Sequence, residues 1–160
     1  MGNTAIMDAG DAVYGSLAEC FITIGKRRYN FMNLTEFESK WDVTISDVKI
    51  LGKVGMGHKA AGGKGTWKGT AHYNQSVLRT MANQYQKTGN LPYFEIQVSN
   101  EDPSSSAGRQ TIIHRGCLCD SCILAKFQAG EEILDEDISG TFESWDMPEK
   151  FKELKGFKTN

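Results

Sequence analysis

Apolar and polar side chains alternate between Thr35 and Ser46. The apolar positions are Phe37, Trp41, Val43 and Ile45. The polar positions are Glu36, Glu38, Lys40, Asp42, Thr44 and Ser46. A period of two predicts a β-strand with one buried and one solvated face, so we expect the apolar positions to pack inside the subunit. The pattern continues to Leu51 with its phase shifted by one residue, which predicts a bulge or bend near Ser46 and Asp47.

A glycine-rich segment, residues 52–65, follows this strand. It is too long for a tight turn and poor in large apolar residues. Because glycine loses the most backbone freedom on ordering, we expect a loop that is mobile in an isolated subunit. Residues 66–73 contain threonine, tryptophan and tyrosine, which favour a returning strand. One small domain cannot cover so long a hairpin, so the pattern predicts contacts from outside the subunit.

The rest of the chain predicts shorter elements. Residues 1–16 are expected to form an extended arm, and 18–24 and 29–34 a hairpin. Helical spacing is found at Val77, Leu78, Met81, Ala82 and Tyr85. Asn74 or Ser76 can cap that helix at its start, and Gly89 can end it.

The carboxyl-terminal half predicts further strands. We expect a strand at 92–99, an exposed loop at 100–108, and either a strand pair or one long bent strand at 109–127. An acidic loop or edge at 131–137 and a last strand at 138–146 follow. Pro148, Phe151, Leu154 and Phe157 suggest a short helix in the terminal tail, residues 147–160. The predicted fold class is mainly β (α+β): a β-sandwich or barrel subunit, residues 1–160, with one packed amphipathic helix and a long hairpin.

Composition narrows the function classes. The 160 residues carry 18 basic and 20 acidic side chains, a net charge of −2. A general nucleic-acid binder usually has a basic excess, so this balance disfavours that class. No apolar run approaches the roughly 20 residues of a membrane helix, and no secretion signal is recognisable at Met1. We therefore expect the protein to stay in the cytosol unless it travels as part of a particle.

Four residues could in principle bind a metal: His114, Cys117, Cys119 and Cys122. On a regular strand, Cys117 and Cys119 face one way and the other two face the opposite way, so they cannot surround one zinc ion. No helix follows the Cys119 and Cys122 pair to lower a thiol pKa, which disfavours a redox role. We therefore expect the cysteines to act as small apolar residues on a pleated surface. The chain also lacks a nucleophile or phosphate-loop motif, so we expect neither enzyme activity nor a cofactor.

Several of these parts resemble the tail tube proteins of contractile-tailed bacteriophages and phage-like elements, the defective-prophage tail tube family. The resemblance includes the glycine-rich segment, the helix that closes with Lys87 and Gly89, the sequence Pro92-Tyr93-Phe94, and the end from Thr141 to Lys150. Together these motifs extend over nearly the whole chain, but the cysteine cluster is not a feature of the family.

The resemblance implies hexameric rings that stack into a hollow tube. The hairpins would join into one β-barrel around the lumen, with the helix outside. The inter-ring assembly loop would comprise Gly52, Lys53, Gly55, Gly57, His58, Lys59, Gly62, Gly63, Lys64 and Gly65. The polar positions from Glu36 to Ser46 would face the lumen.

The implied partners are other copies of the chain, a tail sheath protein, a tape-measure protein and tail initiator or baseplate proteins, with DNA only in transit and no membrane. The implied location is the virion, and the host cytoplasm during assembly.

Two alternatives stay open. One is the tube of a tail-like bacteriocin or a secretion system. The other is a small β-barrel that binds single-stranded nucleic acid through Trp41, Trp67 and Tyr73. The net charge and the acidic residues of the first strand argue against the second alternative.

Overall fold

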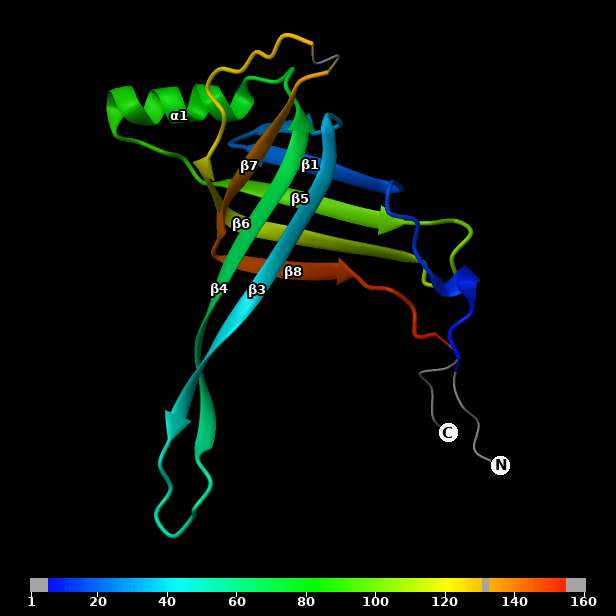
Figure 1. Ribbon diagram of the computed structural model, residues 1–160, viewed down its shortest axis with the longest axis vertical. Coiled ribbons are helices and arrows are strands. Elements are labelled where there is room, and N and C mark those ends of the chain that lie inside the picture. The colour runs from blue at the N-terminus through cyan, green and yellow to red at the C-terminus, as the bar shows by residue number, and fades with distance from the viewer. Residues whose placement is uncertain (1–5, 131–132, 155–160) are drawn as a thin grey trace.

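The computed structural model describes residues 6–130 and 133–154. In this part of the chain a short 3₁₀ helix, eight strands and one α-helix follow one another (Figure 1). Their bounds are η1 Ala9–Asp11, β1 Ala18–Ile24, β2 Arg27–Asn30, β3 Leu34–Val48, β4 Gly57–His72, α1 Val77–Thr88, β5 Phe94–Glu101, β6 Arg109–Ser121, β7 Asp135–Phe142 and β8 Ser144–Glu149.

The strands form one antiparallel sheet in the order β2-β1-β5-β6-β7-β4-β3, with β8 paired to β6. The sheet does not close, because β2 and β3 end the order without pairing to each other. β6 pairs with β5 and β8 along its first part and with β7 at its end. Gly116, with φ of +67°, allows the bend between these parts. The predicted mainly β fold class is confirmed, and residues 109–121 form the long bent strand rather than a strand pair.

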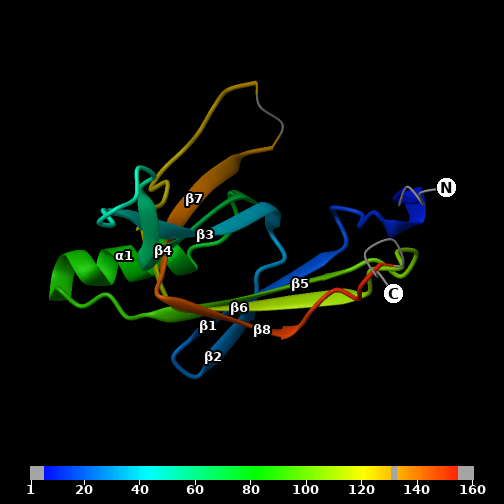
Figure 2. The same cartoon turned by 90° about the horizontal axis from the view of Figure 1, so that it is seen from below.

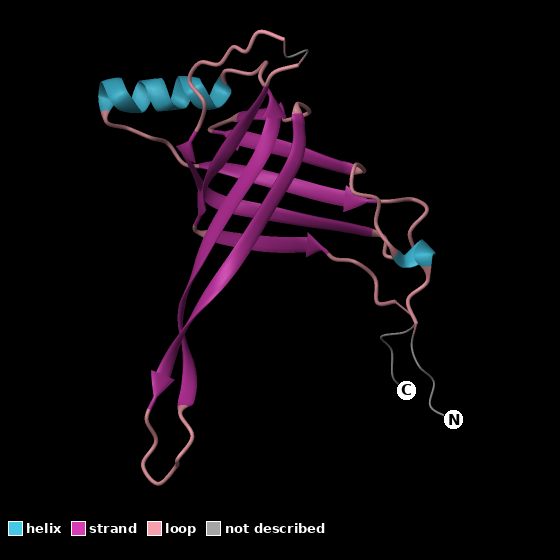
Figure 3. Ribbon diagram, in the orientation of Figure 1, coloured by secondary structure: helices cyan, strands magenta, loops and turns pink. Residues whose placement is uncertain are grey.

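The bend in β6 produces two layers. β3, β4 and β7 cross over β1, β5, β6 and β8 at a large angle, as Figures 1 and 3 show. Figure 2 shows the same layers from below, with α1 at one end. The core between them is rich in aromatic rings: the Trp67 ring lies 6.2 Å from both Phe37 and Phe94, and His114 lies 4.9 Å from Phe142. Each large buried side chain contributes about 1.5–3 kcal/mol to stability.

The helix is where the spacing predicts it. Leu78 and Met81 are buried against the core, whereas Tyr85 at the far end of the stripe is half exposed. Gly89 takes the left-handed conformation, φ +75°, and its N–H donates to the Tyr85 carbonyl at 2.8 Å. Ser76 is the N-cap residue, but its side chain makes no capping hydrogen bond.

The long hairpin differs from the prediction in its connection. β4 begins at Gly57, so only residues 49–56 connect the strands, and residues 57–65 belong to β4. Aromatic rings explain why a glycine-rich sequence is a strand here. A Cβ on Gly63 would lie 2.2 Å from the Trp41 ring, and a Cβ on Gly65 would lie 2.4 Å from the Phe142 ring. Glycine leaves the space in which these rings lie flat on the neighbouring strand.

The bulge is also not where the phase shift predicts it. The register changes between the pairs Val43–Gly63 and Ile45–Ala60, so the extra residue is in β4, with Gly62 at φ +114°. Pairing is regular at Ser46 and Asp47. The irregularity is thus adjacent to the predicted position, but the extra residue is in the partner strand, where Gly62 tolerates positive φ.

The end of the chain was also predicted incorrectly. Residues 138–146 are not one strand: β7 ends at Phe142 and β8 starts at Ser144. Pro148 lies in β8, where the register against β6 is irregular and a missing N–H is tolerated. Residues 150–154 form no helix, and Phe157 lies outside the described residues.

The amino-terminal segment is only partly extended. The turn at Ala9–Asp11 interrupts it, and the Ser106 N–H donates to the Gly10 carbonyl at 3.1 Å. Residues 6–16 therefore lie along the 102–108 loop, while residues 1–5 of the predicted arm lie outside the described residues.

Candidate assembly surface

The apolar face of β3 is only partly buried. Phe37 packs on the Trp67 ring and Trp41 lies 6.0 Å from Phe142. Val43 and Ile45, in contrast, are 50% and 57% exposed. The prediction that this face packs inside the subunit is thus correct at Phe37 and wrong at Val43 and Ile45. The hairpin extends beyond the layer of β1, β5, β6 and β8, so nothing in the described chain lies over its far half (Figure 1).

The outer edge of β3 is a second open surface. In the described residues β3 pairs only with β4, although it is 15 residues long. An edge strand presents a row of backbone N–H and C=O groups that can pair with another chain. Fifteen residues is far longer than the usual strand of about 5–6 residues. β3 therefore combines a long pairing edge with an exposed apolar face.

The opposite face of the hairpin is polar and continuous with β7. All six predicted lumen positions are exposed on it. The pairing places Lys64, Lys68 and Thr70 of β4 beside them, and Asp137 and Ser139 of β7 next in order. Glu38 lies 3.9 Å from Lys68, and Lys40 lies 3.7 Å from Asp42. Exposed pairs of this kind contribute about 0–1 kcal/mol each, so the face gains little stability from its charges.

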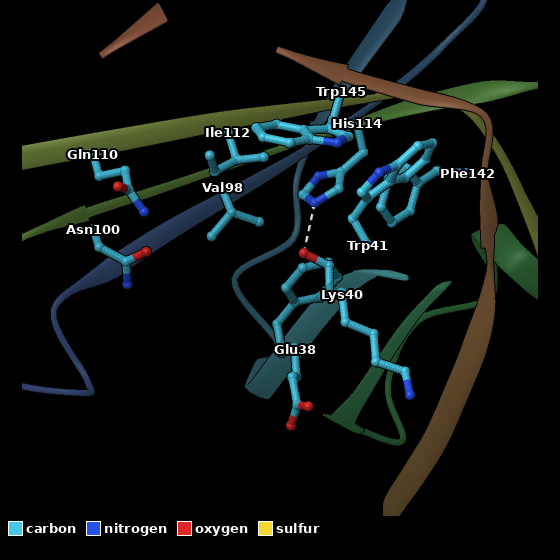
Figure 4. Close-up of a pocket in the computed structure, with 12 residues that line it drawn as sticks. Glu38, Lys40, Trp41, Val98, Asn100, Gln110, Ile112, His114, Phe142 and Trp145 are labelled. Carbon is cyan, nitrogen blue, oxygen red and sulfur yellow. Dashed lines mark hydrogen bonds between the residues drawn. The ribbon is translucent and has the colours of Figure 1, made fainter. Parts of the chain in front are cut away.

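A groove of about 430 Å³ lies between β3 and the strands β5, β6 and β8. Figure 4 shows its apolar wall, which includes Val98, Ile112 and Trp145, and its polar rim with Glu38 and Lys40. His114 lies at its base.

The His114 ring is 1% exposed and connects the two layers. Its Nδ1 donates to the Ile96 carbonyl at 2.9 Å, and its Nε2 accepts from Ser39 Oγ at 2.7 Å, the dashed line in Figure 4. Burial lowers the pKa of His114, which keeps the imidazole neutral and consistent with these roles. A serine bonded to histidine can be a nucleophile, but this imidazole is closed to a substrate and bonds to the main chain. The pair holds β3 against β6.

The cysteine segment is irregular because β6 has a bulge near Gly116. The bulge at Gly116 puts His114 and Cys117 on the same buried side, so the prediction that they face opposite ways is wrong. Cys117 Sγ contacts the His114 carbonyl at 3.4 Å, and burial raises the pKa of this thiol to about 12. Among the described residues no group of three or more potential ligands is placed to hold a metal ion. All four cysteines are free.

The predicted loop residues separate into two groups. Gly52, Lys53 and Gly55 lie in the 49–56 connection. The remaining seven, from Gly57 to Gly65, lie in β4, where His58 Nδ1 is 2.9 Å from an Asp47 carboxylate oxygen. Sequence reasoning missed the exposed apolar side chains of the connection and of the segment between β6 and β7. The pairs Ile50-Leu51 and Ile123-Leu124, each next to a strand end, were the available signal.

In the described part of the chain, no helix has the length and apolar character required to cross a bilayer.

A protein-family model described as "Phage tail tube protein" matches residues 5–149. The chain belongs to the phage tail tube protein family. Two relatives come from Bacillus subtilis strain 168. The protein XkdM of the phage-like element PBSX is 31% identical over 121 residues, which is 76% of this chain and 82% of XkdM. The uncharacterised protein YqbM is 32% identical over 120 residues, 75% of this chain and 82% of YqbM.

Solved structures share the fold of this tail tube protein at low identity. A chain in the baseplate of the anti-feeding prophage matches with a TM-score of 0.60 at 12% identity, over 92% of this chain and 97% of that one. A chain in the virion of a native gene transfer agent matches with a TM-score of 0.54 at 14% identity, over 89% of this chain and 100% of that one.

Membership of the family assigns this tail tube protein a structural, non-enzymatic role in the tail of a phage or phage-like particle. The single-strand-binding alternative required an exposed aromatic platform, but Trp67 is buried in the core. Trp67 therefore cannot take part in such a platform, whereas Trp41 is 38% exposed.

Proposed function

We propose that this tail tube subunit assembles into hexameric rings that stack into a hollow conduit through which DNA leaves the particle. The observation that carries the proposal is β3, a 15-residue edge strand that pairs on one side only within the described chain. Pairing that edge with a neighbouring copy extends the sheet, and repeated pairing around an axis closes it into a barrel, which removes exposed edges.

The exposed apolar face supports the same arrangement. Val43 and Ile45 lose their contact with water when an adjacent copy packs over the far half of the hairpin. Six copies is the number we infer because the anti-feeding prophage baseplate was symmetrised six-fold and a gene transfer agent tail was refined with C6 symmetry. In such a ring α1 lies on the outside.

The polar face of β3, β4 and β7 is the proposed channel lining. It includes the predicted lumen positions from Glu36 to Ser46. Across the three paired strands it carries five carboxylates, Glu36, Glu38, Asp42, Asp135 and Asp137, and four lysines, Lys40, Lys59, Lys64 and Lys68. A strongly basic lining would bind DNA phosphates through counterion release and retard passage. A mixed lining with an acidic excess avoids that retention.

The glycine-rich segment from Gly52 to Gly65 is the proposed joint between rings, and its residues 52–56 lie in the hairpin connection. Within the particle we expect a sheath around the tube, a tape-measure protein in the lumen, and an initiator or baseplate at the end.

Fold similarity to chains of the anti-feeding prophage and of an extracellular contractile injection system favours a second candidate, the tube of such a system or of a tail-like bacteriocin. The two candidates share the ring and differ in cargo. Particles isolated with a DNA-filled head support the phage conduit, and headless particles support the alternative.

The test is assembly of the purified chain, followed by negative-stain microscopy. We expect rings or tubes from the natural sequence. The double variant Val43→Lys with Ile45→Lys should remain folded and form none, because it places charge in the proposed lateral contact. The matched control Thr44→Lys, on the polar face between them, should still assemble. Normal tubes from the double variant, or a natural chain that stays monomeric with its tail initiator present, would contradict the proposal.

A further inference from the structure

The hairpin connection, residues 49–56, has the composition of a docking element, and we name it the tip. The side chains of Leu51 and Val54 are fully exposed, and Met56 is half exposed. Lys49 and Lys53 lie among them. The tip contains neither Asp nor Glu. The tip is therefore both apolar and basic.

A second exposed apolar surface is found between β6 and β7. We name it the shelf and define it as residues 123–130 and 133–137. Phe127 is 94% exposed, and Leu124 and Ile133 are also largely exposed. The carboxylates of Asp135 and Asp137, which are at the end of the proposed channel lining where β7 begins, face solvent on the same segment. Exposed apolar clusters rimmed by charge are typical of protein contact sites. The shelf is thus apolar with acidic residues, complementary to the tip.

Hydrogen bonds fix the shelf against the body of the subunit. Tyr73 Oη donates to the Leu124 carbonyl at 3.1 Å, and Arg79 donates to the Ile123 carbonyl at 3.1 Å. Lys126 donates to the Asp135 carbonyl at 2.7 Å. These contacts hold the shelf at the end of β4 and β7 that is remote from the tip. In Figure 1 the tip is at the lower end of the hairpin and the shelf is at the upper end.

We propose that the tip of one copy binds the shelf of a second copy in the next ring. This inference rests on the proposed function and adds the receiving surface of the inter-ring joint. Two different surfaces at opposite ends of one chain make a head-to-tail contact that propagates in one direction rather than closing on itself. Each ring then offers free shelves on one side and free tips on the other. Lysines against carboxylates set the polarity of stacking and disfavour tip-to-tip contacts.

Mixing two blocked variants tests this directly. The tip variant carries Leu51→Asp and Val54→Asp, and the shelf variant carries Leu124→Asp and Phe127→Asp. All four positions are exposed, so both variants should fold and form single rings without tubes. A one-to-one mixture should give pairs of stacked rings and nothing longer, because one intact tip surface meets one intact shelf. Tyr93→Asp adds a charge at an exposed aromatic residue outside both surfaces and should leave tubes unchanged.

A cysteine pair gives a second readout. Val54→Cys and Phe127→Cys in one chain should produce a ladder of covalent multimers under mild oxidation, whereas each single variant should not. If the shelf variant forms tubes of normal length, or the mixture never pairs, the shelf is not the receptor of the tip. If the natural chain forms neither rings nor tubes, the proposed function itself fails, so the two failures are distinguishable.

Discussion

Replacing single glycines of the hairpin by alanine measures whether residues 57–65 are a packed strand or a loose loop. At Gly65 an added Cβ would lie 2.4–2.6 Å from three atoms of the Phe142 ring. Ordinary contacts between carbon atoms are about 3.5–4.0 Å, so the ring must move by roughly an ångström. The ring is 6% exposed and in contact with His114 and Trp41, which leaves it little room.

We expect Gly65→Ala to lower the free energy of unfolding by about 2 kcal/mol. Overpacking a core usually costs about 1–3 kcal/mol, and the lower entropy of unfolded alanine returns about 0.4–1 kcal/mol. At Gly63 an added Cβ would meet the Trp41 ring instead, but that ring is partly exposed and can rotate into solvent. We expect a loss of about 1 kcal/mol there, close to the value of one aromatic pair.

Gly55 is the matched control, because a Cβ there would have no neighbour within 4 Å and its φ is not in the left-handed region. Gly55→Ala should change stability by less than about 0.5 kcal/mol. Urea unfolding of the unassembled chain, followed by tryptophan fluorescence, measures all three variants. For a chain of this size Gly65→Ala should also lower Tm by about 4–8 °C. Equal stability of the three variants would mean that the aromatic rings do not cover β4, and the strand assignment would be refuted.

Two further predictions concern buried ionisable groups. Arg79→Met should destabilise the chain by about 3–5 kcal/mol in chemical unfolding, because Glu136, which is 6% exposed, would lose its ion-pair partner inside the protein. The double variant Arg79→Met with Glu136→Leu should recover part of that loss. An Arg79→Met variant as stable as the natural chain would contradict the pairing. Burial lowers the pKa of His114 in the folded chain, so on acidification the unfolded chain takes up the proton first. The free energy of unfolding should therefore fall as the pH drops below about 6.5, by at most about 1.4 kcal/mol per pH unit. His114→Gln should flatten this pH dependence.

The sequence predicted those secondary-structure elements whose position depends on neighbouring residues alone. β1 and α1 were located correctly, since strand alternation, helical spacing and a left-handed Gly89 are properties of neighbouring residues. The start of β4 was not predictable in this way. Glycine between Gly57 and Gly65 indicates a loop unless one knows that Trp41 and Phe142 lie over it, and that proximity depends on the register of three strands.

The faces of β3 show the same limit. Alternation correctly separated a polar face from an apolar one, but it cannot tell whether a covering layer reaches every apolar position. The layer of β1, β5, β6 and β8 reaches Phe37 and leaves Val43 and Ile45 uncovered. The roles of the glycine-rich segment and of the lumen positions stay predictions, because they concern neighbouring copies of the chain.

A long edge strand with an exposed apolar face should make a subunit prone to uncontrolled pairing, and the charges of β3 counter this. One face of β3 carries two acids, Glu36 and Glu38, followed by the base Lys40 and the acid Asp42. Like charges directly opposite each other destabilise a strand pair, and a shift of one residue moves every side chain to the other face. Most registers of accidental pairing therefore place acid against acid or an apolar residue in water. A partner in one register can avoid both penalties, which would restrict this edge to the neighbour that completes the ring.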